Sequence, residues 1–172
     1  RNHSGSFFIN TYPFWAYRAG DALAAQLEYA LLQKPMTVDG VTYRNMLETQ
    51  LAAVRSALLR LDEDFTTGAL PIVIGETGWP TEGHPVATVE NALKFAKGVA
   101  KLNVNAYLFA AFDEEGRTPE PEYGVSPPPD APLEGSWGIF YENGTMKYDV
   151  PFLHFIPAPS PSPSPSPPSP SP

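Results

Sequence analysis

The stretch LPIVIGETGWP, residues 70–80, places a carboxylate directly after a run of apolar residues. The run favours a buried strand because it is rich in β-branched residues, Ile72, Val73 and Ile74. Gly75 lets the chain bend, and Gly78 and Pro80 are residues that end a strand. The sequence therefore predicts that Glu76 lies at the carboxyl end of a buried strand, between Gly75 and the indole of Trp79.

Two further apolar stretches predict strands, SFFINT at residues 6–11 and NAYLFAAF at residues 105–112. The strand that contains the opening run is expected at residues 70–75. Apolar residues recur at helical spacing over residues 44–61 and 86–102, which predicts a helix between each pair of strands. Apolar strands that alternate with helices indicate an α/β fold in which all three strands are parallel neighbours.

Polar or aromatic residues follow each expected strand in turn: Asn10 and Tyr12, then Glu76 and Trp79, then Asp113 and Glu114. In parallel α/β folds, functional groups collect at the carboxyl ends of the strands. A single acid in such a position is usually a helix cap or a solvated loop residue. Three successive polar strand ends favour one shared cleft.

Aromatic residues cluster near the same strand ends, and they indicate what the cleft binds. Sugar rings present apolar C–H faces that pack on indole and phenol rings, while carboxylates and amides bind the hydroxyls. Core packing is the simpler interpretation for the aromatics inside the strands, Phe7, Phe8 and Phe109. Trp79 differs, because it lies in a Gly/Pro-rich turn without a regular packing period. The remaining candidates for a sugar-binding surface are Tyr12, Phe14, Trp15, Tyr17 and Trp137.

Composition excludes several classes of protein. The 172 residues suffice for one domain, and a net charge of -8 argues against a nucleic-acid partner. The chain has no cysteine, which rules out disulfides and thiolate metal sites. It has no apolar stretch of the about 18 residues that a membrane span requires. It also shows no secretory signal, but the sequence starts at Arg1 rather than Met, so this absence excludes no compartment. We expect a monomer without metal or cofactor.

The composition changes at Pro157, where the chain becomes PAPSPSPSPSPPSPSP. Proline has a fixed φ and no backbone donor, so residues 157–172 are expected to be a disordered, extended polyproline II stalk. Such Ser/Pro runs are typical of wall-associated glycosylated proteins, although an unmodified flexible linker is the alternative. Two N-glycosylation sequons, Asn2-His3-Ser4 and Asn143-Gly144-Thr145, also fit an extracellular or cell-wall location.

Four segments, INTYPFWAY, IVIGETGWPTEG, YLFAAFDEE and SWGIFYENGTMKYDV, resemble the plant-type endo-β-1,3-glucanases of glycoside hydrolase family 17 in order and spacing. The resemblance extends over residues 7–150. It implies a retaining glycosidase that hydrolyses β-1,3-glucan on a (β/α)8 TIM barrel. Residues 1–156 would then form a partial barrel, approximately strands 6 to 8 with their helices.

The resemblance also assigns roles to residues. Glu76 matches the family's nucleophile, and the substrate-binding cleft would contain Asn10, Tyr12, Phe14, Tyr17, Trp79, Glu114 and Trp137. The family's acid/base, a Glu after Asn at the end of the fourth strand, has no counterpart in this sequence, so the chain is expected to be an inactive C-terminal part. A proline-rich insertion, TPEPEYGVSPPPDAPLEG, replaces a short basic loop beside the cleft.

Two other hypotheses fit parts of the sequence. A non-catalytic glucan-binding or structural wall protein would explain the stalk and the missing acid/base equally well. An α/β fragment without any carbohydrate role would require the GETGWP block and the aromatic residues to be coincidental. An upstream Asn-Glu block in the same reading frame would favour the enzyme.

Overall fold

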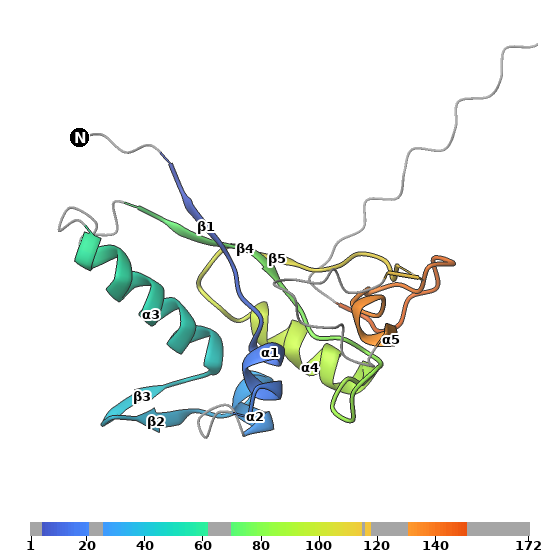
Figure 1. Ribbon diagram of the computed structural model, residues 1–172, viewed down its shortest axis with the longest axis horizontal. Helices are drawn as coiled ribbons and strands as arrows, with labels where there is room; N and C mark the ends of the chain where they lie inside the picture. The colour runs from blue at the N-terminus through green and yellow to red at the C-terminus, as the bar shows by residue number, and fades with distance from the viewer. Residues whose placement is uncertain (1–4, 21–25, 62–69, 115, 118–130, 151–172) are drawn as a thin grey trace, which may run out of the picture.

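The computed structural model describes residues 5–20, 26–61, 70–114, 116–117 and 131–150. The proposed stalk and the sequon at Asn2 lie outside these residues. The described residues are built around a three-stranded parallel sheet in the order β1-β4-β5 (Figure 1). Its strands are β1 at Phe7–Asn10, β4 at Ile72–Thr77 and β5 at Ala106–Leu108. The structure thus confirms three parallel neighbouring strands.

Strand β4 lies in the middle of the sheet, as its buried β-branched residues require. Ile72, Val73 and Ile74 are all buried. The strand continues to Thr77, two residues beyond the predicted end, so Glu76 lies within the strand. Strand β5 ends at Leu108, earlier than predicted. Phe109 N still donates to the Thr77 carbonyl, but from Ala110 to Asp113 the chain bonds instead to residues 137–140.

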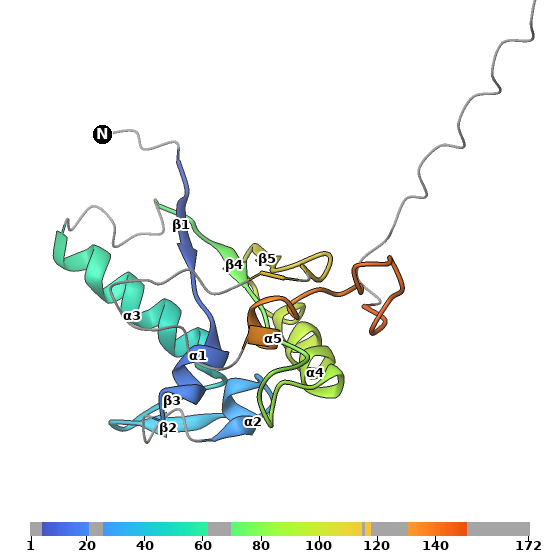
Figure 2. The ribbon, with the colours of Figure 1, turned by 45° about the vertical axis from the view of Figure 1, so that its right-hand side comes forward.

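The two expected helices are α3 at Met46–Leu61 and α4 at Val89–Val99. Both lie on the same side of the sheet (Figures 1 and 2). Side-chain caps fix their starts, because the first N–H groups of a helix have no partner within it. Asn45 Oδ1 accepts a hydrogen bond from Glu48 N at 3.0 Å. Thr88 Oγ1 accepts one from Asn91 N at 3.2 Å, which places the start of α4 three residues later than predicted.

Several short elements were not predicted. They are helices α1 at Pro13–Arg18, α2 at Leu27–Ala30 and α5 at Ala131–Glu134, and a hairpin of β2 at Met36–Val38 and β3 at Val41–Tyr43. Pro13 favours the start of α1 because its fixed φ suits the first helical turn. In the hairpin turn, Asp39 and Gly40 have φ values of 49° and 78°, the conformation that an Asp-Gly pair adopts readily.

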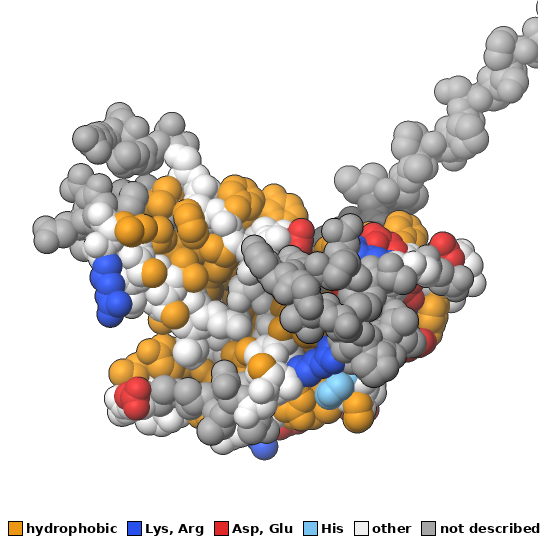
Figure 3. All heavy atoms as spheres, in the orientation of Figure 1, with side chains coloured by type: hydrophobic (Ala, Val, Ile, Leu, Met, Phe, Trp, Pro, Cys, Tyr) orange, Lys and Arg blue, Asp and Glu red, His pale blue; other side chains and the backbone are white. Residues whose placement is uncertain are grey.

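The core lies between the sheet and the helices and is rich in aromatic side chains. Phe14 of α1 and Phe95 of α4 enclose Trp79, whose side chain is buried. The two outer strands, in contrast, carry exposed aromatic side chains. Phe8 of β1 is 59% exposed and Tyr107 of β5 is 62% exposed. Figure 3 shows hydrophobic side chains gathered on the surface formed by α3 and the sheet. No helix among the described residues is long and apolar enough to cross a membrane.

Candidate active site

The candidate site is centred on Glu76, near the carboxyl end of β4. The register of the sheet pairs Asn10 of β1 with Glu76, after a shift between Ile9 and Asn10. Two residues after Asn10, the Tyr12 hydroxyl donates a hydrogen bond to Glu76 Oε2 at 2.9 Å. The two neighbouring strands therefore bring together three residues that the sequence predicted to share a cleft. Glu76 and Tyr12 are half-buried and Asn10 is exposed.

The environment keeps Tyr12 protonated. Burial raises the pKa of its hydroxyl most, and the hydrogen bond to Glu76 and the negative charge of Glu76 raise it further. An ionised phenolate beside the carboxylate would lose the hydrogen bond and add repulsion. Tyr12 is therefore a lasting hydrogen-bond donor that orients one oxygen of Glu76.

Two aromatic rings pack against Tyr12 and restrict its position. Its ring meets that of Trp137 edge-on at 5.2 Å between centroids, and that of Phe109 edge-on at 6.4 Å. Gly78 makes this packing possible. A Cβ at this glycine would lie 2.2 Å from the Phe109 carbonyl oxygen and 3.1 Å from the Trp137 ring. The second glycine of GETGWP thus allows the chain after β5 to approach the strand that carries Glu76.

Three aromatic residues that were expected to contact a sugar are instead buried in the core. Phe14, Trp79 and Trp137 are 0%, 2% and 4% exposed, so their rings have no face available to a ligand. Trp79 Nε1 donates to the Val86 carbonyl at 2.9 Å, which satisfies the indole inside the core. Tyr17 is half-buried and packs on Trp79 at 6.4 Å between ring centroids. Trp79, which the sequence placed in the sugar cleft because its turn shows no regular packing period, is packed in the core instead.

Glu114 lies near the site but is held by an exposed contact. Its Oε2 is 2.6 Å from Arg117 Nη1, and the Glu114 side chain is 53% exposed. The Arg117 guanidinium in turn lies over the Phe109 ring, 5.2 Å from its centroid. Because Phe109 also packs on Tyr12, the charged pair borders the Tyr12–Glu76 group. Asp113, predicted at the same strand end, instead forms a largely buried contact with Lys147.

Glu134 is an acid near the site that the sequence did not indicate. It ends α5 and is half-buried. Burial raises its pKa, and the charges of Arg117 and Arg18 partly oppose that rise. Its charge also acts on Tyr12, raising the pKa of that hydroxyl slightly further. One clue was present in the sequence, because Glu134 lies three residues before Trp137, a candidate for the sugar-binding surface. The proline-rich insertion around Glu134 has no periodicity, however, so its position in the fold could not be predicted.

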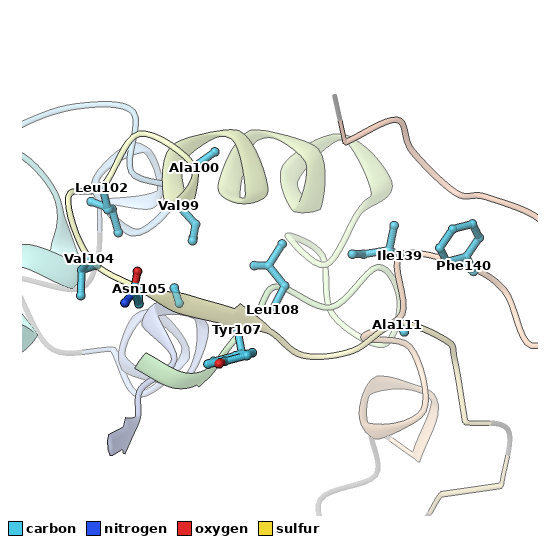
Figure 4. A pocket seen from close by; sticks show the side chains of 11 residues that line it. Val99, Ala100, Leu102, Val104, Asn105, Tyr107, Leu108, Ala111, Ile139 and Phe140 are labelled. Atoms are coloured by element: carbon cyan, nitrogen blue, oxygen red, sulfur yellow. The ribbon is translucent and has the colours of Figure 1, made fainter. Parts of the chain in front are cut away.

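A groove of about 560 Å³ lies away from these residues, beside β5 and the end of α4. Figure 4 shows Val99 and Leu108 extending into the space between helix and strand, with Ile139 beside them. This lining is mainly apolar and lacks the converging polar groups that hold a sugar. Within the described ranges, no group of three or more His, Cys, Asp or Glu residues is placed to hold a metal ion.

Comparison with known proteins identifies the family to which this chain belongs. Residues 1–152 match the glycosyl hydrolases family 17. The match covers most of the chain, and the chain belongs to this family.

Relatives in plants are named as glucanases. Glucan endo-1,3-beta-glucosidase 12 of Arabidopsis thaliana is 32% identical over 85% of this chain and 28% of its own length. The basic isoform 1 of glucan endo-1,3-beta-glucosidase from Solanum tuberosum is 31% identical over 88% of this chain and 44% of its own. The chain spans less than half the length of these relatives.

Two solved plant structures superimpose on this chain. CJP38, a beta-1,3-glucanase and allergen of Cryptomeria japonica pollen, superimposes with a TM-score of 0.66 at 29% identity. The match covers 84% of this chain and 45% of CJP38. One of the plant beta-glucan endohydrolases has a TM-score of 0.68 at 24% identity, covering 86% of this chain and 47% of its own, which supports the fold alone.

Proposed function

We propose that this chain is the C-terminal part of a retaining glycosidase that hydrolyses β-1,3-glucan, with Glu76 as the nucleophile. The observation that carries this proposal is the hydrogen bond from Tyr12 to Glu76 Oε2 at the carboxyl ends of two adjacent parallel strands. The names of the family's plant members support the substrate class. The chain would supply approximately strands 6 to 8 of a TIM barrel.

Retaining hydrolysis requires two carboxyl groups about 5–5.5 Å apart, one that attacks the anomeric carbon and one that protonates the leaving oxygen. In this proposal Glu76 attacks through the oxygen that Tyr12 does not hold. The bond between the anomeric carbon and the leaving oxygen breaks, and water later hydrolyses the glycosyl-enzyme. The proposal places the acid/base residue outside these 172 residues, so that the chain by itself would lack the proton donor.

Sugar binding would use the exposed and half-buried groups around Glu76. In this proposal Asn10 and Tyr12 would contact hydroxyls, and Glu114 with Arg117 would form a charged border. The buried rings of Phe14, Trp79 and Trp137 act from within the core, by supporting Tyr12 and the strand ends. We further propose an extracellular or cell-wall location, which the Ser/Pro-rich residues 157–172 support.

A covalent trap tests the nucleophile in the full-length product of the gene. An activated 2-fluoro β-1,3-linked disaccharide should form a stable glycosyl ester on Glu76, detected by peptide mass spectrometry. Glu76→Gln should remove the label and lower laminarin hydrolysis by orders of magnitude, since amide and acid have similar size but only the carboxylate attacks. Glu114→Gln, the matched control, should retain the label.

The 172-residue chain alone should not hydrolyse laminarin. Robust hydrolysis by it would place the acid/base within this sequence and overturn the proposed division of roles. The competing hypothesis is a non-catalytic glucan-binding wall protein. It predicts that the full-length product binds laminarin but forms no ester with the trap, and that Glu76→Gln changes nothing in either measurement.

A further inference from the structure

We propose that the side-chain nitrogen of Asn143 is an attachment site for an N-linked glycan. Asn143, Gly144 and Thr145 form the acceptor triplet, with threonine in the third position. Such triplets are common in sequences, so the proposal rests on the conformation and exposure of this one. It goes beyond the glucanase function and requires only that the chain enters a secretory compartment.

The triplet lies at the tip of a small antiparallel loop. Phe140 and Met146 form the bridge at its base. Tyr141 N donates to the Thr145 carbonyl at 2.8 Å, and Gly144 N donates to the Tyr141 carbonyl at 2.9 Å. Gly144 has φ of 83°, a value that glycine adopts without strain, so the middle residue of the triplet suits the turn.

The residues at the tip are exposed to solvent. Asn143, Gly144 and Thr145 are all exposed, as is Glu142 before them. A Cβ built on Gly144 meets no atom within 4 Å. In both ribbon views the segment that carries the triplet loops out on the side of the molecule opposite α3 (Figures 1 and 2). A large sugar can therefore be attached without displacing a packed residue.

The side chain of Asn143 is held by a hydrogen bond within the triplet. Its Oδ1 accepts a hydrogen bond from Thr145 N at 2.9 Å, which closes an Asx turn. A hydrogen bond to the amide oxygen stabilises the negative charge that this oxygen takes up when Nδ2 gives up a proton. The turn thus fixes the amide and favours the nucleophilic form of its nitrogen.

The reaction needs an oligosaccharide donor linked to a lipid pyrophosphate. Nδ2 of Asn143 attacks the anomeric carbon of the first sugar, and a carbon–nitrogen bond forms. The bond from that carbon to the pyrophosphate oxygen breaks, and the lipid pyrophosphate leaves with the bonding electron pair. Nδ2 loses one proton to the transferring enzyme, and no oxidation or reduction takes place.

The test expresses the full chain behind a cleavable secretion signal in a eukaryotic host, so that entry into the compartment is supplied. Total cell and medium protein is digested, and glycans are released by a peptide N-glycosidase in heavy-oxygen water. We expect the peptide with Asn143 to carry the isotopic mark. Asn143→Gln and Thr145→Ala should abolish it, Thr145→Ser should retain it, and Asn2→Gln should leave it unchanged. An unmarked Asn143 in the parent chain would overturn the proposal.

The contribution of the turn is tested on folded protein. Chain purified without glycans is incubated with an oligosaccharyltransferase and donor, either folded or after denaturation. We expect the folded chain to be modified at Asn143. Modification of the denatured chain alone would contradict the role assigned to the Asx turn. Neither assay uses glucan hydrolysis, so failure in either leaves the proposed glucanase function to its own test.

Discussion

Lys147 Nζ lies 2.6 Å from Asp113 Oδ1, and the lysine side chain is only 1% exposed. The same ammonium group donates to Thr81 Oγ1 at 2.7 Å, while Gly138 N donates to Asp113 Oδ1 at 2.9 Å. Thr81 follows the GETGWP block and Asp113 follows β5. This buried pair therefore joins the segment after β4, the segment after β5 and the C-terminal loop into one unit.

Replacing Lys147 by methionine should destabilise the chain strongly. The substitution leaves Asp113 as a largely buried charge without its cation, a change that costs about 3–5 kcal/mol. Urea unfolding followed by tryptophan fluorescence measures the free energy of unfolding. The control is Lys94→Met, which breaks the exposed pair with Glu90 and should leave the free energy of unfolding nearly unchanged. Equal losses for the two variants would contradict the prediction.

Gly78→Ala should disturb the packing around Glu76. The new methyl group would meet the Phe109 carbonyl oxygen, a backbone atom that cannot move as a flexible side chain does. We expect a loss of about 1–3 kcal/mol in unfolding free energy. Thermal unfolding by circular dichroism provides the measurement. Gly5→Ala is the matched control, because a Cβ there meets nothing within 4 Å, and its melting temperature should equal that of the parent chain.

Glu134→Gln should stabilise the chain at neutral pH and change the pH dependence of its stability. Burial raises the pKa of Glu134, so the folded state holds its proton more tightly than the unfolded state. The stability that this proton contributes is complete below the ordinary value of 4.5 and is lost as the pH rises through the higher folded value. Glu134→Gln should thus have a higher free energy of unfolding than the parent chain only above about pH 4.5.

Urea unfolding at a series of pH values gives this curve. Glu90→Gln is a control of opposite sign, since Lys94 lowers the pKa of exposed Glu90. Its effect should be small, a slight loss of stability at neutral pH that vanishes as the pH falls, because the pair that Glu90 forms with Lys94 is exposed. A stabilising effect of Glu134→Gln that persists unchanged at acid pH would show that shape, rather than charge, is responsible.

Tyr12→Phe in the full-length gene product should slow attack by Glu76 while leaving the fold intact. The variant removes only the hydroxyl that donates to Glu76 Oε2, and a hydrogen bond to a charged group contributes about 1.5–3 kcal/mol. The rate of ester formation with the fluorinated trap should fall by about tenfold or more. Tyr107→Phe removes an exposed hydroxyl on β5 and should leave the rate unchanged. Equal rates for Tyr12→Phe and the parent would show that the Tyr12 hydroxyl does not contribute to the reaction.

The parallel sheet could be predicted because the sequence patterns that define its strands and helices are local. The β-branched run before Glu76 defines a strand, and helical spacing defines α3 and α4. The hairpin was predictable in principle from Asp39-Gly40, although its strands of three residues are too short for a clear alternation. The proximity of Asn10, Tyr12 and Glu76 was predictable because neighbouring strand ends determine it.

The aromatic residues were harder to place because their burial depends on distant partners. Trp79 is covered by Phe14 of α1 and Phe95 of α4, and no local pattern links these segments. A glycine- and proline-rich turn resembles an exposed loop until its neighbours are known. Glu134 was missed for a similar reason, since its relation to Tyr12 arises only when the segment around α5 folds back on the sheet.

The two outer strands of the sheet affect how the isolated chain behaves in solution. β1 and β5 carry exposed aromatic side chains, Phe8 and Tyr107, on a sheet type that other proteins keep covered. An exposed strand edge is a template on which another polypeptide can add a strand. Recombinant chain should therefore associate with increasing concentration and salt, because salt screens the repulsion from its net charge of -8. Purification calls for low ionic strength and dilute protein.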